Sequence, residues 1–116
     1  MSEITHRTPT EGIDIVENNT LGQLMKDYML YYKKPSITPR TFEHQMRNFY
    51  LHIYDKIGNM KLYEVKPIVI QKLFNEMLDN NYSLATTRKI KFLLNQFFKY
   101  AKSQNLVNEN PVSQLF

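Results

Sequence analysis

The chain has 116 residues, of which 42% are hydrophobic and 22% charged, and this composition is typical of one globular domain. The absence of cysteine excludes a disulfide framework and thiolate metal sites. No apolar run approaches the roughly 18 residues that a membrane span needs. Residues 1–12 also lack the apolar core of a secretory signal. We therefore expect a cytoplasmic protein that has no membrane partner.

The N-terminal part of the chain divides into a leader and a first helix. Residues 1–19 are polar with one short apolar patch, so we expect a flexible leader or linker there. Thr20 followed by Gln23 has the spacing of a capping box, which predicts a helix beginning after Thr20. Apolar residues keep helical spacing up to Tyr32, and Pro35 disfavours helical geometry at the residue before it. We expect this helix to stop just before that proline.

A second helix is expected to begin at Thr38, which suits an N-cap, with Pro39 at the first helical position. A turn at residues 57–59, which contain Gly58, should end it. Five residues at helical spacing are expected to form its apolar face, namely Phe42, Met46, Phe49, Tyr50 and Ile53.

The third helix follows a short connector, residues 60–66, in which Leu62 and Val65 are expected to fold under the bundle. Pro67 should open the helix, and residues 79–81 should close it. Its apolar face is expected to comprise Ile70, Leu73, Phe74, Met77 and Leu78.

The fourth helix is the longest, with Ser83 as its N-cap and its end near Gln104. Four amphipathic helices without any useful β-alternation predict an all-α fold, a four-helix bundle with a flexible N-terminal leader. We place the helical domain at residues 20–112, and we expect residues 113–116 to begin an interdomain linker.

The charge of the chain is concentrated in the fourth helix. Residues 80–108 contain five basic side chains and no acidic one, whereas residues 1–79 hold ten of each sign. An exposed helix ordinarily mixes both signs, so an acid-free face predicts a surface for a polyanion such as a phosphate backbone. We call the following residues, which share an arc of about 80° on the helix, the basic stripe: Arg88, Lys91, Asn95, Lys99 and Lys102.

The second helix carries a shorter positive face opposite its apolar one. Arg40, His44 and Arg47 recur there at helical spacing. Both helices also begin with hydroxyl side chains, and free N–H groups, short hydroxyls and a following Arg are suited to gripping phosphate. The hydroxyl residues beyond the caps are Thr41, Thr86 and Thr87. For Thr86 and Thr87 the alternative is a purely structural role, in which they add to the cap of their helix.

The sequence holds no constellation that predicts catalysis. It has three glycines and no glycine-rich phosphate loop. His44 and His52 lie about 80° apart around a helix, which is too far for a shared metal ion. We expect no catalytic residue, no metal site and no cofactor.

From Thr20 onward the chain resembles the core-binding (SAM-like, N-terminal) domain of phage-integrase-family tyrosine recombinases. The resemblance is carried by the order and spacing of four runs, of which the last also shows the aromatic-Ala pair Tyr100-Ala101 and the Asn-Pro that precedes the family's catalytic domain. The runs are TLGQLMKDY, SITPRTFEHQMRNF, HIYDKIGNMKLYEVKPIVIQKLF and SLATTRKIKFLLNQFFKYAKSQNLVNENPV.

This resemblance implies that the second and fourth helices lie against double-stranded DNA and form half of a clamp at the core crossover site of an integrase from a mobile element. It also implies that the full-length protein oligomerises on DNA, whereas we expect this fragment to be monomeric. Carried over to matching positions, the DNA-facing residues are Arg40, Thr41, His44 and Arg47 on the second helix, and Thr86, Thr87, Arg88, Lys91 and Asn95 on the fourth.

The resemblance places the family's catalytic residues beyond Asn110-Pro111, so we expect this chain not to be an enzyme while its parent protein is a tyrosine recombinase. His44 and Arg47 do spell the family's His-x-x-Arg pair, but they lie inside the second helix, and we interpret this as coincidence. The alternative is a helical protein–protein interaction module that uses the same faces to bind an acidic partner.

Overall fold

The computed structural model describes residues 20–115 as an all-α fold, and the leader expected at residues 1–19 lies outside the described residues. Within residues 20–115 the chain forms four main helical segments joined by short turns, as predicted. The elements are α2 (Leu21–Tyr28), η1 (Met29–Lys33), η2 (Lys34–Ser36), α3 (Pro39–Asn48), η3 (Phe49–Tyr54), α4 (Asp55–Ile57), η4 (Leu62–Glu64), α5 (Pro67–Asp79), α6 (Leu84–Ser103) and η5 (Pro111–Gln114).

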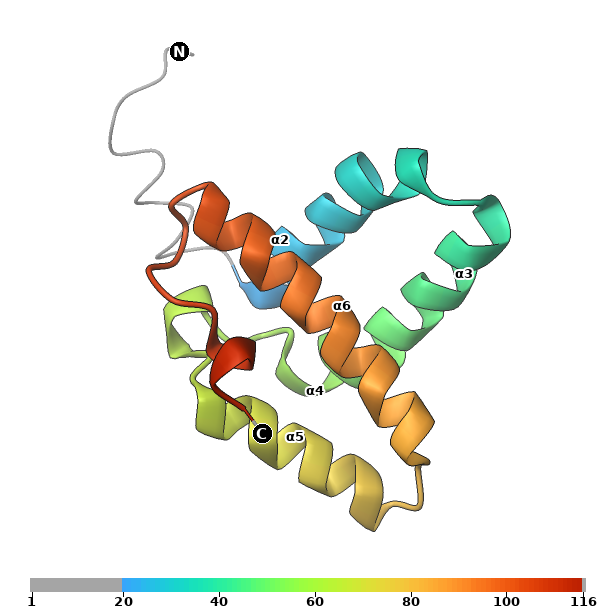
Figure 1. Ribbon diagram of the computed structural model, residues 1–116, viewed down its shortest axis with the longest axis vertical. Helices are drawn as coiled ribbons and strands as arrows, with labels where there is room; N and C mark the ends of the chain where they lie inside the picture. The colour runs from blue at the N-terminus through green and yellow to red at the C-terminus, as the bar shows by residue number, and fades with distance from the viewer. Residues whose placement is uncertain (1–19, 116) are drawn as a thin grey trace.

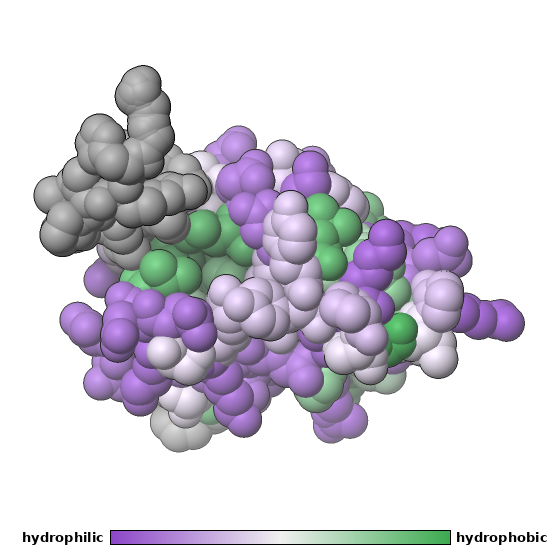
Figure 2. All heavy atoms as spheres, turned by 90° about the horizontal axis from the view of Figure 1, so that it is seen from above, coloured by the Kyte–Doolittle hydropathy of each residue, from purple (hydrophilic) through white to green (hydrophobic). Residues whose placement is uncertain are grey.

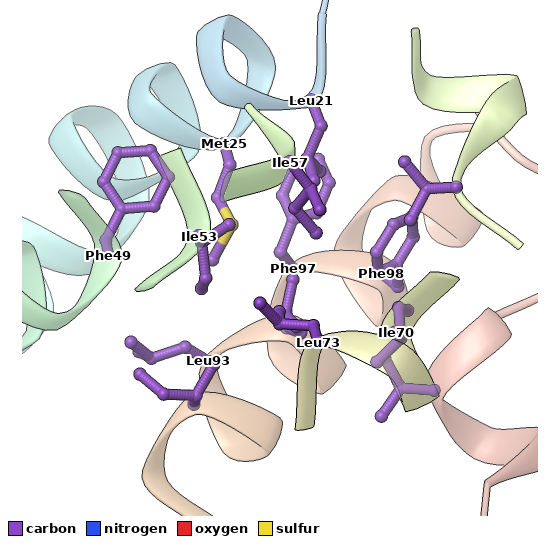
Figure 3. Close-up of a cluster of buried hydrophobic side chains, with 14 of the residues drawn as sticks. Leu21, Met25, Phe49, Ile53, Ile57, Ile70, Leu73, Leu93, Phe97 and Phe98 are labelled. Atoms are coloured by element: carbon purple, nitrogen blue, oxygen red, sulfur yellow. The ribbon is translucent and has the colours of Figure 1, made fainter. Parts of the chain in front are cut away.

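Helix α6 crosses the middle of the molecule, with α2 and α3 on one side and α5 on the other (Figure 1). Figure 3 shows Phe97 of α6 in the centre of the core, among Leu21, Ile57 and Leu73 of the other helical segments. The face shown in Figure 2 is largely hydrophilic, with smaller apolar areas between the polar side chains. The residues of α6 that are buried in the core are Ile90, Leu93, Leu94, Phe97, Phe98 and Ala101.

The predicted helix starts are confirmed. The side-chain oxygens of Thr20, Thr38 and Ser83 each accept a hydrogen bond from the backbone N–H three residues later. Such a cap satisfies one of the amides that a helix start leaves without a partner. In a capping box the Gln23 side chain would bond back to the N-cap residue. Here the Gln23 side-chain amide instead donates to Asp27 Oδ1 at 3.2 Å.

Two helical segments contain wider π-helical turns, η1 after α2 and η3 after α3. A step of four residues turns an α-helix about 40° past a full circle. A π turn contains more residues per turn, so residues four apart come closer to the same side of the helix. Phe49, Ile53 and Ile57 therefore stay on one buried face. Tyr50, expected on that face, is 40% exposed, and Leu78, expected on the apolar face of α5, is also exposed.

The remaining predictions for the connector are confirmed, because Leu62 and Val65 are buried in the core. At the other end, η5 packs against α5 and α6 through the buried Val112, and Leu115 is partly buried against the core. The boundary that we place after residue 112 stays a prediction.

Two backbone segments approach each other closely at Gly22. The N–H groups of Leu21 and Gly22 donate to the carbonyls of Met60 and Gly58, at 2.8 and 2.9 Å, so the turn after α4 receives the first amides of α2. A Cβ added at Gly22 would lie 2.9 Å from the Gly58 carbonyl oxygen and 2.9 Å from the Tyr54 ring. Because one of these neighbours is backbone, no side-chain rotation relieves the contact.

We predict that Gly22→Ala lowers the free energy of unfolding by about 1–3 kcal/mol, since overpacking at a rigid contact has this effect. At an unconstrained helix position the same change raises stability by about 1 kcal/mol. The sign is therefore the test, measured by urea unfolding, with the neighbouring surface change Gln23→Ala as a control expected to stay within about 0.5 kcal/mol. A stabilised Gly22→Ala variant would contradict the close approach.

His52 is a titratable residue that the fold buries. It is 4% exposed, and its ring meets Tyr82 edge to face, with the centroids 4.7 Å apart. A small cavity beside it, of about 210 Å³, is also lined by Asp55, Lys56 and Glu76. Burial, and to a lesser extent the positive charge of Lys56, lower the pKa of His52. Folding therefore favours the neutral imidazole.

We predict that stability falls as the pH drops below about 6.5, the ordinary pKa of histidine. The unfolded chain takes up the proton at a higher pH than the folded one, so acid favours unfolding until the folded pKa has also been passed. His52→Phe keeps an aromatic ring against Tyr82 and should reduce the dependence of the unfolding free energy on pH between 7 and about 5. An equal slope in the variant and the original protein would refute this origin.

Candidate nucleic-acid interface

Residues of α3 and α6 line an open groove of about 490 Å³ between the two helices. Both helices begin on the right-hand side of Figure 1, where the start of α3 lies above the start of α6. The groove brings together Thr41, His44 and Arg88 of the predicted site. Its full lining is Thr41, His44, Gln45 and Asn48 from α3 and Arg88, Lys89, Phe92 and Leu93 from α6.

The first turns of α3 and α6 have the same hydroxyl arrangement. Thr38 Oγ1 donates to Thr41 Oγ1 at 2.9 Å, and Ser83 Oγ donates to Thr86 Oγ1 at 3.1 Å. Each cap oxygen also accepts the backbone N–H of its hydroxyl partner. The hydroxyls of Thr41 and Thr86 are therefore oriented by their own helix starts.

Thr87 differs from Thr86 in its surroundings. It is buried, and its Oγ1 donates to the Ser83 carbonyl at 3.1 Å, so it completes the cap of α6. A role of Thr87 in DNA binding stays a prediction.

The basic residues of the two helices point largely into solvent. Arg40, Arg47, Arg88, Lys99 and Lys102 are exposed, and Lys91 is half-buried. Within residues 20–115, the structure gives none of these cations a carboxylate partner. For the cations of α6, this agrees with the absence of acidic residues from that helix.

Asn95 is the one member of the basic stripe that has a defined partner. Its Oδ1 accepts a hydrogen bond from Asn110 Nδ2 at 2.8 Å, and Asn110 Oδ1 in turn accepts the Val112 N–H at 2.9 Å. This chain of bonds fixes η5 to α6, with Asn110 itself buried. The structure thus gives Asn95 a stabilising role, while contact with DNA stays a prediction.

The sequence reasoning missed four groove residues, Gln45, Asn48, Lys89 and Phe92. Phe92 is 52% exposed and lies apart from the buried apolar residues of α6. A signal was present, because Phe92 follows Arg88 by four residues and so lies only about 40° from it around the helix. Gln45 and Asn48 likewise follow Thr41 at helical spacing.

Lys33 of η1 lies against Phe92, one of the residues that line the groove. It is only 9% exposed, and its Nζ donates to Gln96 Oε1 at 2.6 Å and lies 5.7 Å from the centre of the Phe92 ring. Burial lowers the pKa of Lys33. The lysine joins η1 to α6 and holds one face of the Phe92 ring, and a cation in this position is attracted to the ring.

The histidine and carboxylate side chains are the candidate metal ligands within residues 20–115. Among residues 20–115 the structure contains no group of three or more His, Asp or Glu side chains able to hold a metal ion. His44 lies in the groove whereas His52 lies in the core. None of the described helices is both long and apolar enough to cross a membrane.

Residues 20–78 match the family described as phage integrase, N-terminal SAM-like domain, and the chain belongs to this family. A XerC-like tyrosine recombinase of Caldanaerobacter subterraneus subsp. tengcongensis is 30% identical over 95 residues, which are 79% of this chain and 24% of the relative. The chain therefore spans about a quarter of the length of that curated relative.

Solved structures share the fold. The solution structure of an integrase-like domain from Bacillus cereus has a TM-score of 0.80 at 18% identity, over 84% of this chain and 82% of that one. Lambda integrase, in a crystal structure of its dimer bound to a COC′ core site, has a TM-score of 0.78 at 19% identity, over 97% of this chain and 31% of that one. The SAM-like fold expected from the sequence is confirmed.

We predict that Asn95→Ala and Asn110→Ala each lower the free energy of unfolding by about 1–2 kcal/mol, since each leaves a polar partner unsatisfied. Because the two side chains bond to each other, their effects should not add. A double-mutant cycle by urea unfolding should give a coupling of about 1 kcal/mol. Additive effects would mean that the bond contributes nothing to the fold.

Proposed function

We propose that this chain is the part of a site-specific tyrosine recombinase that clamps double-stranded DNA at the core crossover site. Its membership of the integrase SAM-like family and the DNA in the crystal structure of its structural neighbour lambda integrase support this. The face in contact with DNA would be the one formed by α3 and α6.

One observation carries the proposal. Helices α3 and α6 carry exposed cations that no carboxylate within residues 20–115 neutralises, and both helices begin with hydroxyls that their caps orient. Arg88, Lys89 and Thr41 line the groove between the two helices. Lys and Arg side chains, short hydroxyls and helix starts are the groups that ordinarily contact the DNA backbone. The same groups fix a protein on the duplex without reading its sequence, so the cations alone would give only modest sequence preference.

The chemistry of recombination would lie elsewhere in the parent protein. His44 and Arg47 lie on α3, the helix that lines one side of the groove, and this position suits DNA contact rather than catalysis. We propose that the catalytic residues lie beyond the Asn110-Pro111 pair and that the parent protein assembles into oligomers on DNA, whereas residues 20–115 bind as a monomer.

We predict that Lys91→Glu combined with Lys99→Glu weakens binding to a core-site duplex at least tenfold without unfolding the bundle. Each reversal replaces an attraction to phosphate by a repulsion. Fluorescence anisotropy with a labelled duplex measures the affinity, and NMR chemical shifts during the titration locate the contact on α3 and α6.

The matched control is Lys66→Glu combined with Lys72→Glu, which changes the net charge by the same amount. Lys66 is the N-cap residue of α5, Lys72 lies within α5, and both are exposed. It should lower affinity far less than the stripe variant. Equal losses in both variants would mean that only net charge matters, and shifts confined to α2 or α5 would refute the proposed face.

The salt dependence provides an independent prediction. Contact with about four or five phosphates should give a plot of log affinity against log salt concentration with a slope near −4. Removing two phosphate contacts with the stripe variant should make the slope shallower by about 2. A slope near zero would favour a protein partner instead of DNA.

A further inference from the structure

We propose that the groove between α3 and α6 reads one A·T base pair through Gln45 and Phe92. This inference rests on the proposed function, because it assigns the groove to base edges and the surrounding cations to phosphates. It names residues that the charge pattern does not select.

The lining of the groove separates into charged and neutral parts. Arg88 and Lys89 carry positive charge, whereas Gln45, Phe92 and Leu93 are neutral. A phosphate gains little from an apolar wall, because it would lose water there without finding an ionic partner. The edge of a base pair is flat and carries both apolar and hydrogen-bonding groups, so it matches the neutral part.

Gln45 is the groove residue that we expect to form hydrogen bonds with the base. Its Oε1 is buried and accepts no hydrogen bond, although the residue as a whole is partly exposed and lines the groove. An unsatisfied buried acceptor is unfavourable, so a ligand that brings a donor would draw the amide outward. In the major groove of DNA the available donors are the N6 amino group of adenine and the N4 amino group of cytosine.

Phe92 distinguishes between these two donors. Its ring is half-exposed, and Lys33 at 5.7 Å from its centre holds one face, with the lysine itself fixed by Gln96. An exposed apolar ring in contact with DNA favours the C5 methyl group of thymine, which only the A·T pair presents. Gln45 would then accept from adenine N6 and donate to adenine N7, while Phe92 covers the methyl group of the paired thymine.

The first experiment is a selection from duplexes with a randomised central segment, performed with the original protein and with Gln45→Ala and Phe92→Leu. The original protein should enrich an A·T pair at one fixed position, and each variant should lose that enrichment. Binding to the unselected pool should change by less than about twofold, because the phosphate contacts remain.

Modified bases then test each contact in the enriched duplex. Replacing the thymine by uracil removes one methyl group and should weaken binding by about fourfold. Replacing the adenine by 7-deazaadenine removes the N7 acceptor and should weaken binding by about fivefold. Phe92→Leu should reduce the response to uracil, and Gln45→Ala should abolish the response to 7-deazaadenine.

Matched controls are Gln71→Ala on α5 and Tyr63→Ala on η4, which remove a partly exposed glutamine and a 55% exposed aromatic ring. Both should keep the selected sequence and both responses. Enrichment of a G·C pair, or the same sequence in all variants, would overturn the assignment while DNA binding itself stands. Failure of the original protein to bind the pool would instead overturn the proposed function, so the two failures are distinct.

Discussion

The burial of one face of α6 determines the position of the α6 side chains in the candidate interface. Ile90, Leu94, Phe97, Phe98 and Ala101 are fully enclosed by the other helical segments. A helix with this much apolar surface in the core has no freedom to rotate, since any rotation would expose it to water. The opposite face is therefore held toward solvent, and the cations of the basic stripe lie on it.

The second consequence of this burial is the groove. Helix α6 packs against α5 and η3, and the edge of its exposed face lines a groove together with residues of α3. The remaining cations of the basic stripe lie outside the groove, while Gln45 and Phe92 line it next to Arg88 and Lys89. Affinity and selectivity would thus come from different parts of one surface, an arrangement that is general in protein–DNA recognition.

The sequence was sufficient for the parts of the structure that local chemistry controls. Thr38 and Ser83 begin helices as caps, and the absence of acidic residues from α6 leaves its cations without partners there. Features that depend on contacts distant in sequence were not predictable: Lys33 meets Gln96 across 63 positions, and Asn95 meets Asn110 from another element. Gln45 was passed over because its unsatisfied oxygen becomes apparent only when the surrounding packing is known.

The π turns η1 and η3 have a consequence for the comparison of relatives. A π turn accommodates an additional residue within a continuous helix, so a related chain with regular α-helical turns at the same place needs one residue fewer. The gap in an alignment then belongs inside the helix, at 29–33 or 49–54, and not in the loop that follows. An alignment that keeps helices free of gaps would shift every position on one side of the π turn by one residue, and would pair the buried Ile53 with a surface residue of the relative.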